Sequence, residues 1–157
     1  MIVVSDTSPL NYLVLIDLQH ILPELFERIL IPSAVRDELQ SAGAPEAIAR
    51  FMAAAPAWLE TREVSEVDPK LQHLDRGERE AIGLGMRLSA DVVLLDERKG
   101  RQAARDRGLA VSGTLGVLDL ADRRGLVHLA DAIDRLKATN FRASPRVLKQ
   151  FGGSSNL

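Results

Sequence analysis

Four acidic residues stand at or beside the apolar segments of this 157-residue chain, and their types suit them to bind a cation together. Each is tied to the end of a predicted strand or to a neighbouring helix. Because the carboxyl ends of parallel strands share one edge of a sheet, residues far apart in sequence can converge there. Ligand sets made only of oxygen favour Mg2+ or Mn2+ over zinc. The candidate catalytic residues and metal ligands are Asp6, Glu38, Glu80 and Asp96.

Crowded carboxylates also define the chemistry that this site would perform. Like charges at close range raise one another's pKa, so four such groups need a counter-charge. A divalent cation supplies it, lowers the pKa of a coordinated water and orients a phosphodiester. The chain has no cysteine, and its three histidines share no ligand spacing. Metal-assisted hydrolysis fits these absences, because it needs no side-chain nucleophile.

Asp6 is the strongest single candidate. It ends a predicted buried strand over residues 2–5, and two hydroxyl residues, Thr7 and Ser8, follow it. Ser8 is the predicted N-cap of the next helix, with Pro9 in the first helical position. That assignment leaves the carboxylate of Asp6 for ligand binding, with the two hydroxyls beside the metal and substrate.

Asp96 follows the clearest predicted strand, residues 91–95. It is interpreted as a metal ligand, as the N-cap of a helix that starts near Arg98, or as both. Its neighbour Glu97 is expected beside the ligand set. Glu38 lies on the polar side of a helix opened by Pro32, and it joins the site only through the other three acids.

Two glutamates compete for the third position. Glu78 fits a capping box with Asp75 at the start of a helix over residues 77–88, whereas Glu80 lies nearly one turn further in. Glu80 is the preferred metal ligand and Glu78 the alternative metal ligand.

Substrate contacts are predicted from the local distribution of charge. The net charge of −2 excludes a polycation that would coat nucleic acid non-specifically. The densest basic stretch begins two residues after Asp96 and includes Lys99 and Arg101; it is either a solvated helix face or a phosphate-guiding rim. Thr114 opens a helix after Gly113, and its backbone N–H is interpreted as an anion site or a plain helix start.

The periodicity predicts one α/β domain over residues 1–151 and a flexible tail over 152–157. Alternating strands and helices indicate a three-layer α/β/α sandwich with a mostly parallel sheet. No apolar segment is long enough for a membrane span and no basic leader precedes residue 2, so a cytoplasmic location is expected. Strands are predicted at 2–5, 29–31, 58–64 (an edge), 91–95 and 109–111, and helices at 9–17, 21–28, from 33, 45–55, 77–88, 98–108, 114–124, 130–139 and 145–151.

Segments spread over almost the whole chain resemble one family. They are Ser5-Asp6-Thr7-Ser8-Pro9-Leu10, Ile31-Pro32-Ser33-Ala34-Val35 with Glu38-Leu39, Gly77-Glu78 with Glu80-Ala81-Ile82, Leu95-Asp96 with Gly100-Arg101, and Gly108-Leu109 with Gly113-Thr114-Leu115-Gly116. Together they are similar to the PIN domain family, and the first resembles the opening motif of its small prokaryotic branch.

That resemblance implies a metal-dependent ribonuclease, the toxin of a toxin–antitoxin pair. It implies the same four acids as ligands of Mg2+ or Mn2+, Thr7 or Ser8 near the metal, and RNA as substrate. It also implies a homodimer and a small antitoxin protein that covers the site. The chain departs from many such toxins in having a glutamate as third acid, and a basic rather than an aromatic segment after Asp96.

Two other classes compete with this interpretation. A phosphoacceptor or phosphohydrolase domain would need paired acids near the first strand and a lysine at a late strand end, and the sequence has neither. A non-catalytic PIN-like module that binds nucleic acid or protein remains the alternative.

Overall fold

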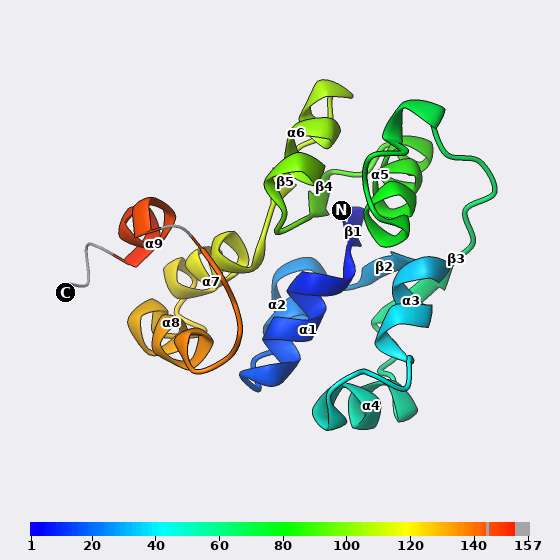
Figure 1. The fold of residues 1–157 in the computed structure, drawn as a ribbon. Coiled ribbons are helices and arrows are strands. Elements are labelled where there is room, and N and C mark those ends of the chain that lie inside the picture. Colours follow the sequence, from blue (N-terminus) through cyan, green and yellow to red (C-terminus); the bar gives the residue numbers. More distant parts are fainter. Residues whose placement is uncertain (144, 153–157) are drawn as a thin grey trace.

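Short aliphatic runs form a sheet of five parallel strands in the computed structural model, which describes residues 1–143 and 145–152. The strand order is β3-β2-β1-β4-β5, with β1 in the centre (Figure 1). The chain therefore runs outward from β1 on one side and returns to its other side at β4. The strands are β1 (Val3–Ser5), β2 (Ile29–Pro32), β3 (Leu59–Arg62), β4 (Val92–Leu94) and β5 (Val111–Ser112).

Helices cover both faces of this sheet, and their bounds follow the sequence pattern closely. The helices are α1 (Thr7–Leu15), α2 (Ile21–Phe26), α3 (Ser33–Leu39), α4 (Glu46–Ala53), α5 (Arg76–Leu88), α6 (Arg98–Asp106), α7 (Thr114–Arg123), α8 (Leu129–Lys137) and α9 (Pro145–Gly152), with a 3-10 turn at Pro69–Leu71. The predicted three-layer α/β/α sandwich is confirmed.

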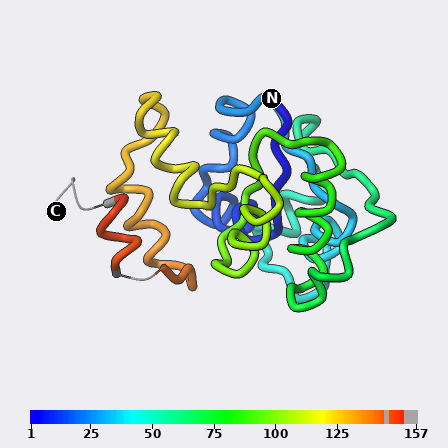
Figure 2. Tube along the Cα trace, turned by 90° about the horizontal axis from the view of Figure 1, so that it is seen from above, coloured from blue at the N-terminus to red at the C-terminus, as the bar shows by residue number. Residues whose placement is uncertain are grey.

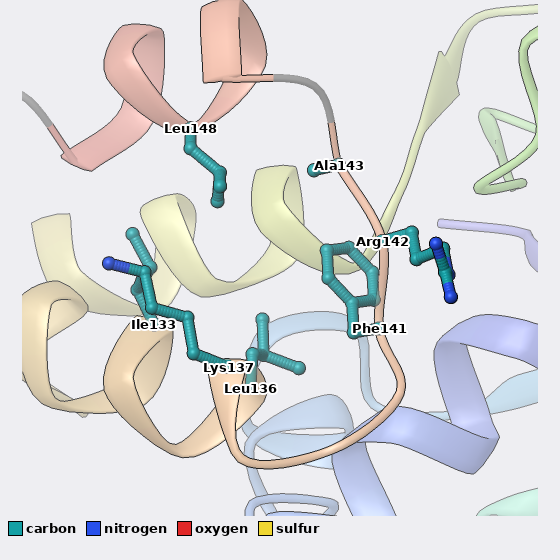
Figure 3. A pocket seen from close by; sticks show the side chains of 7 residues that line it. All are labelled: Ile133, Leu136, Lys137, Phe141, Arg142, Ala143 and Leu148. Carbon is teal, nitrogen blue, oxygen red and sulfur yellow. The ribbon is translucent and has the colours of Figure 1, made fainter.

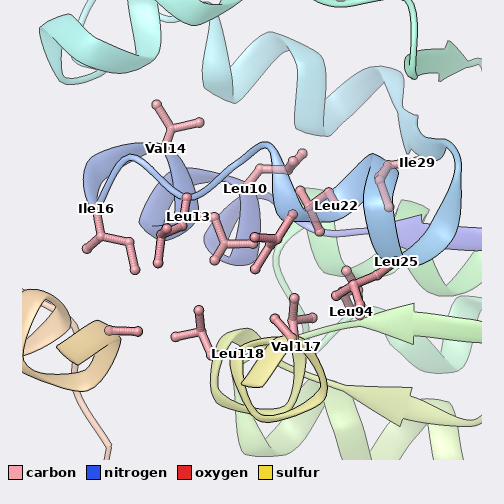
Figure 4. Close-up of a cluster of buried hydrophobic side chains, with 14 of the residues drawn as sticks. Leu10, Leu13, Val14, Ile16, Leu22, Leu25, Ile29, Leu94, Val117 and Leu118 are labelled. Carbon is pink, nitrogen blue, oxygen red and sulfur yellow. The ribbon is translucent and has the colours of Figure 1, made fainter. Parts of the chain in front are cut away.

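Strand alternation divides the core into two clusters. Val3 and Val4 are both almost fully buried, but they belong to different clusters because successive strand side chains point to opposite faces. One cluster joins the sheet to α1, α2 and α7, where Leu13 and Leu118 lie (Figure 4). The other joins it to α5 and α6. Burial on both faces explains why these strands are continuous aliphatic runs.

The C-terminal helices gather at one end of the molecule. Helices α7, α8 and α9 lie beside one another, at the opposite end from α5 (Figure 2). The predicted tail at 152–157 begins at the last residue of α9, and residues 153–157 lie outside the described part of the chain.

Two predicted element starts are wrong by more than one residue. The fifth strand begins at Val111 rather than Leu109, because Gly108 has φ +80° and the N–H of Leu109 still donates to the carbonyl of Ala104, closing α6. Helix α1 begins at Thr7, with Asp6 in the N-cap position. Ser8 is therefore not the N-cap; it lies inside the helix.

Candidate active site

The ends of β1 and β4 form the point where the chain order reverses, which is where open α/β sheets bind their ligands. Asp6 directly follows β1, and its N–H donates to the carbonyl of Leu94 in β4 at 3.0 Å. Ser5 pairs with Leu94 in the register of these two strands. This pairing places Asp6 and Asp96 at the carboxyl ends of neighbouring strands; whether they share a ligand stays a prediction.

Asp6 and Glu38 both face the start of α5. A Cβ built on Gly77 would lie 3.0 Å from Oδ1 of Asp6, a tight contact, and 2.8 Å from Oε1 of Glu38, which would have to move. The hydroxyl of Thr7 donates to Oε2 of Glu38 at 2.6 Å. A glycine at position 77 is thus what lets the two carboxylates approach α5.

Glu78 lies deeper, between α5 and α6. Its side chain is almost fully buried, and its Oε2 has no hydrogen-bond partner among the described residues. A Cβ on Gly100 of α6 would lie 2.5 Å from this oxygen. The predicted capping box is confirmed in part, because the carboxylate of Asp75 accepts the N–H of Glu78 at 2.8 Å.

Asp6, Glu38 and Glu78 together are called the acid cluster below. Burial raises the pKa of Glu78 to about 7, helped by a hydrogen bond and charge from Asp75. Burial also raises the pKa of Asp6 well above its usual value; the N–H of Thr7 opposes this shift, while the charges of Asp75, Glu78 and Glu38 add to it. The acid cluster therefore holds negative charge at an energetic cost, as expected for like charges in a desolvated site.

Asp96 has very different surroundings. Its Oδ1 accepts the N–H of Thr114 at 2.7 Å, and its Oδ2 accepts the hydroxyls of Thr114 at 2.7 Å and Ser8 at 2.8 Å. Asp96 is therefore not the N-cap of α6, a position that Glu97 occupies. Its carboxylate lies instead at the start of α7, so the anion expected at Gly113-Thr114 is supplied by the protein itself.

Glu80 is committed to structural contacts. Its Oε1 accepts the N–H of Ala34 at 3.1 Å, and its Oε2 accepts Nε of Arg76 at 3.1 Å. These contacts tie α5 to the start of α3.

The predicted substrate contacts have different environments. Lys99 is exposed at the start of α6. Arg101 is half-buried, and its guanidinium donates to the backbone carbonyls of Leu95 and Asp96, which places it under the end of β4. Thr114 is fully buried against Asp96. Of these three residues, Lys99 is exposed, Arg101 is partly exposed and Thr114 is buried.

Sequence reasoning missed Tyr12. Its ring is partly exposed on α1, one turn beyond Ser8, and the charges of Asp96 and Glu97 both act on its hydroxyl. Helical spacing of four residues from Ser8 was the available signal, because residues i and i+4 share a helix face. Gly77 and Gly100 were also missed as space-making positions, although each adjoins a predicted site residue.

The acids fit a hard cation in chemistry, since all donors are carboxylate oxygens and one of them is buried without a partner. They do not form a finished coordination shell: across residues 1–143 and 145–152, no group of three or more acidic or histidine side chains is arranged to hold a metal ion. Asp96 is held apart from the acid cluster by its three donors. No helix in this described part is long and apolar enough to cross a membrane.

The fold and the site together define an open parallel α/β/α domain with carboxylates at its topological switch point. A family model described as PIN domain matches residues 2–155. The chain belongs to the PIN domain family, whose members are generally nucleases and typically use divalent metals.

A solved structure supports the same fold. The chain is similar to a PilT N-terminus domain protein from the hyperthermophilic archaeon Sulfolobus solfataricus P2, with a TM-score of 0.53 and 16% identity, covering 92% of this chain and 100% of that one. At this identity the likeness concerns the fold alone. No match was found among the curated proteins.

Proposed function

We propose that this protein is a metal-dependent endoribonuclease that hydrolyses RNA phosphodiester bonds. The observation that carries the proposal is the buried, unpartnered Oε2 of Glu78 inside the acid cluster. Burying a carboxyl oxygen without a hydrogen-bond partner costs free energy, and such groups are more common at functional sites than elsewhere.

Asp6, Glu38 and Glu78 are the proposed ligands of Mg2+ or Mn2+. Glu78 takes the place preferred for Glu80 in the sequence, because Glu80 already accepts from Ala34 and Arg76. When bound, the metal supplies a counter-charge and lowers the pKa of a coordinated water. Asp96 completes the acidic set at the neighbouring strand end, oriented by Ser8 and Thr114.

RNA is the proposed substrate. It is proposed to reach the acid cluster along the first turn of α6. Arg98 and Lys99 are exposed there, close in sequence to Asp96. Cations beside a cluster of acids are needed, because the acids alone would repel a phosphodiester. Thr7 and Ser8 act by orienting Glu38 and Asp96 through their hydroxyls.

The test is cleavage of a labelled RNA in the presence of Mn2+ by the parent protein and by Asp6→Asn. We expect cleavage by the parent and a loss of about a thousandfold in the variant, since several kcal/mol of transition-state stabilisation go with the ligand. Asp134→Asn, at an exposed position on α8, is the matched control and should cleave normally. Equal activity in the parent and Asp6→Asn would remove the nuclease proposal.

A non-catalytic module that binds nucleic acid is the second candidate. The observation that favours it is the incomplete metal shell among the described residues. It predicts that the parent binds RNA but leaves it intact at any Mn2+ concentration, so the same assay with a binding measurement separates the two.

The proposed setting is the toxin of a toxin–antitoxin pair, active as a homodimer and inhibited by a small antitoxin that covers the acid cluster. It is supported by the resemblance of Ser5–Leu10 to the opening motif of such toxins. Expression should arrest growth, Asp6→Asn should relieve the arrest, and light scattering on the purified protein should give twice the chain mass. Normal growth with an active nuclease would contradict the toxin role alone.

A further inference from the structure

Arg98 and Lys99 are exposed on the α6 side of the site. A further arginine, Arg142, lies in the segment between α8 and α9. Arg142 is exposed, and within the described residues it forms no ion pair and no side-chain hydrogen bond. Its charge reaches the hydroxyl of Tyr12, on which Asp96 and Glu97 also act. Arg142 also directly follows Phe141, whose ring packs against Tyr12, so it lies near the Tyr12 side of α1.

The segment that carries Arg142 is fixed in place. The ring of Phe141 packs edge-on against Tyr12, with centroids 5.0 Å apart and an interplanar angle of 86°. The hydroxyl of Tyr12 donates to Oδ1 of Asn140 at 2.9 Å, and the N–H of Phe141 donates to the hydroxyl of Thr139. An arginine on such an anchored segment has a defined position relative to α1.

Figure 3 shows that the neighbouring side chains of Phe141 and Arg142 point in different directions. Phe141 and Arg142 both line a cavity of about 260 Å³ under α9; the ring of Phe141 lies next to Leu136, whereas the guanidinium end of Arg142 extends away from the leucines. Phe141 thus serves as the anchor, and Arg142 is left to meet a ligand.

Helix α1 connects this place to the acids. Asp6 precedes its first residue, Ser8 touches Asp96, and Tyr12 lies one turn of about 5.4 Å further along the same face. An RNA strand whose phosphate sits at the acids and which continues along α1 would meet Tyr12 and then Arg142. Arginine pairs strongly with phosphate, and an aromatic ring beside it suits a base or sugar.

We propose, on the basis of the nuclease function above, that Arg142 and Tyr12 form a subsite for the RNA strand next to the cleaved bond. Arg142 binds a backbone phosphate, and the ring of Tyr12 contacts the neighbouring nucleoside. The strand is then held between cations on both sides of the acids, those of α6 and that of Arg142.

The test measures binding of a fluorescein-labelled single-stranded RNA to the Asp6→Asn protein, which leaves the RNA intact, at several salt concentrations. Adding Arg142→Ala should weaken binding about tenfold and reduce the salt slope by about 0.7, the value for one phosphate contact on a single strand. Adding Arg142→Lys should recover part of the affinity.

Arg124→Ala is the matched control. Arg124 is exposed at the far end of α7, a helix that starts at the site with Thr114, so its removal should leave affinity and salt slope unchanged. Tyr12→Leu should weaken binding by about threefold, and Tyr12→Phe should weaken it less, because the ring that meets the nucleoside is kept while the hydrogen bond to Asn140 is lost.

Two failures are distinguishable. If Asp6→Asn binds RNA equally with and without Arg142, the subsite is wrong while the nuclease function stands, and Arg142 belongs to a surface for an acidic protein instead. If the parent neither binds nor cleaves RNA, the proposed function fails and the subsite falls with it.

Discussion

Asp6 and Asp96 follow neighbouring parallel strands, yet their carboxylates have opposite surroundings. Asp96 receives three hydrogen bonds from Ser8 and Thr114, and they leave its charge well compensated. Asp6 is buried next to Glu38 and Glu78, and its pKa rises well above its usual value through burial and through their charges. The charge of Asp96 is thus compensated by hydrogen bonds within the protein. The charges of the acid cluster repel one another and have no counter-charge among these groups.

The difference shows where a cation would contribute most. A group already compensated by donors gains little from a metal, whereas like charges without a counter-ion gain a great deal. The acid cluster is therefore the half that should respond to metal, and Asp96 the half that fixes the frame. The predictions below test this division.

The largest expected effect separates Glu78 from Glu80. Glu78→Gln should lower Mn2+-dependent RNA cleavage about a thousandfold, because the buried unpartnered oxygen is a proposed ligand. Glu80→Gln should lower it by no more than about tenfold, since that side chain joins α5 to α3 and reaches the acids only indirectly. Steady-state cleavage rates on one RNA decide between them. The reverse order would show that Glu80 leaves its partners when metal binds.

The next effect concerns pH and the metal-free protein. The folded pKa of Glu78, about 7, exceeds its ordinary value of 4.5, so the folded state holds this proton more tightly than the unfolded chain does. The resulting stability is complete below pH 4.5 and is lost as pH rises through 7. We expect the free energy of unfolding to fall by about 1–3 kcal/mol over that window in urea titrations.

Glu78→Gln is the control for this pH dependence. It should reduce the fall to the part that comes from Asp6, and saturating Mn2+ should reduce the fall in the parent, because the cation compensates the ionised acids. Asp68, whose pKa is lowered by the N–H of Lys70 and by Arg107, acts below pH 3.8 and leaves the window unaffected. A fall of undiminished size in Glu78→Gln would show that Glu78 does not contribute and would assign the pH dependence to Asp6.

Local sequence signals were sufficient for the fold. Short aliphatic runs such as Val92–Leu94, bounded by turn residues, favour strands covered on both faces, and proline, glycine and acidic caps delimit the helices between them. The edge position of β3 was also predicted, from the alternation of polar and apolar residues around Leu59. These features depend on neighbours in sequence, which is why they could be read without coordinates.

The partners of each acid could not be predicted in the same way. Whether Glu78 or Glu80 faces the acid cluster depends on how α5 is rotated about its axis against α3 and α6. The close approach of Glu78 to Gly100 goes with the observed rotation, and this contact between two helices has no local sequence signal. Likewise, Asp96 meets Thr114 across 18 residues of chain, so its role at the start of α7 has no local signature.

The smallest expected effect concerns the hydrogen bonds to Asp96. Thr114→Val keeps the shape of the side chain and the N–H bond to Asp96 but removes the hydroxyl bond, so we expect a loss of about 1 kcal/mol in unfolding free energy. Thr61→Val, on the edge strand β3 with no side-chain hydrogen bond among the described residues, should cost much less. Denaturant unfolding of the two variants and the parent gives the comparison.

The same variant shows whether the two halves are independent. If the acid cluster alone binds the cation, Mn2+ should stabilise Thr114→Val as much as it stabilises the parent, because the charges of Asp6, Glu38 and Glu78 are untouched. Free energies of unfolding that add in this way indicate separate sites. A smaller Mn2+ effect in Thr114→Val would mean that Asp96 shares the ion, and the division between a compensated half and a stressed half would have to be replaced by one four-acid site.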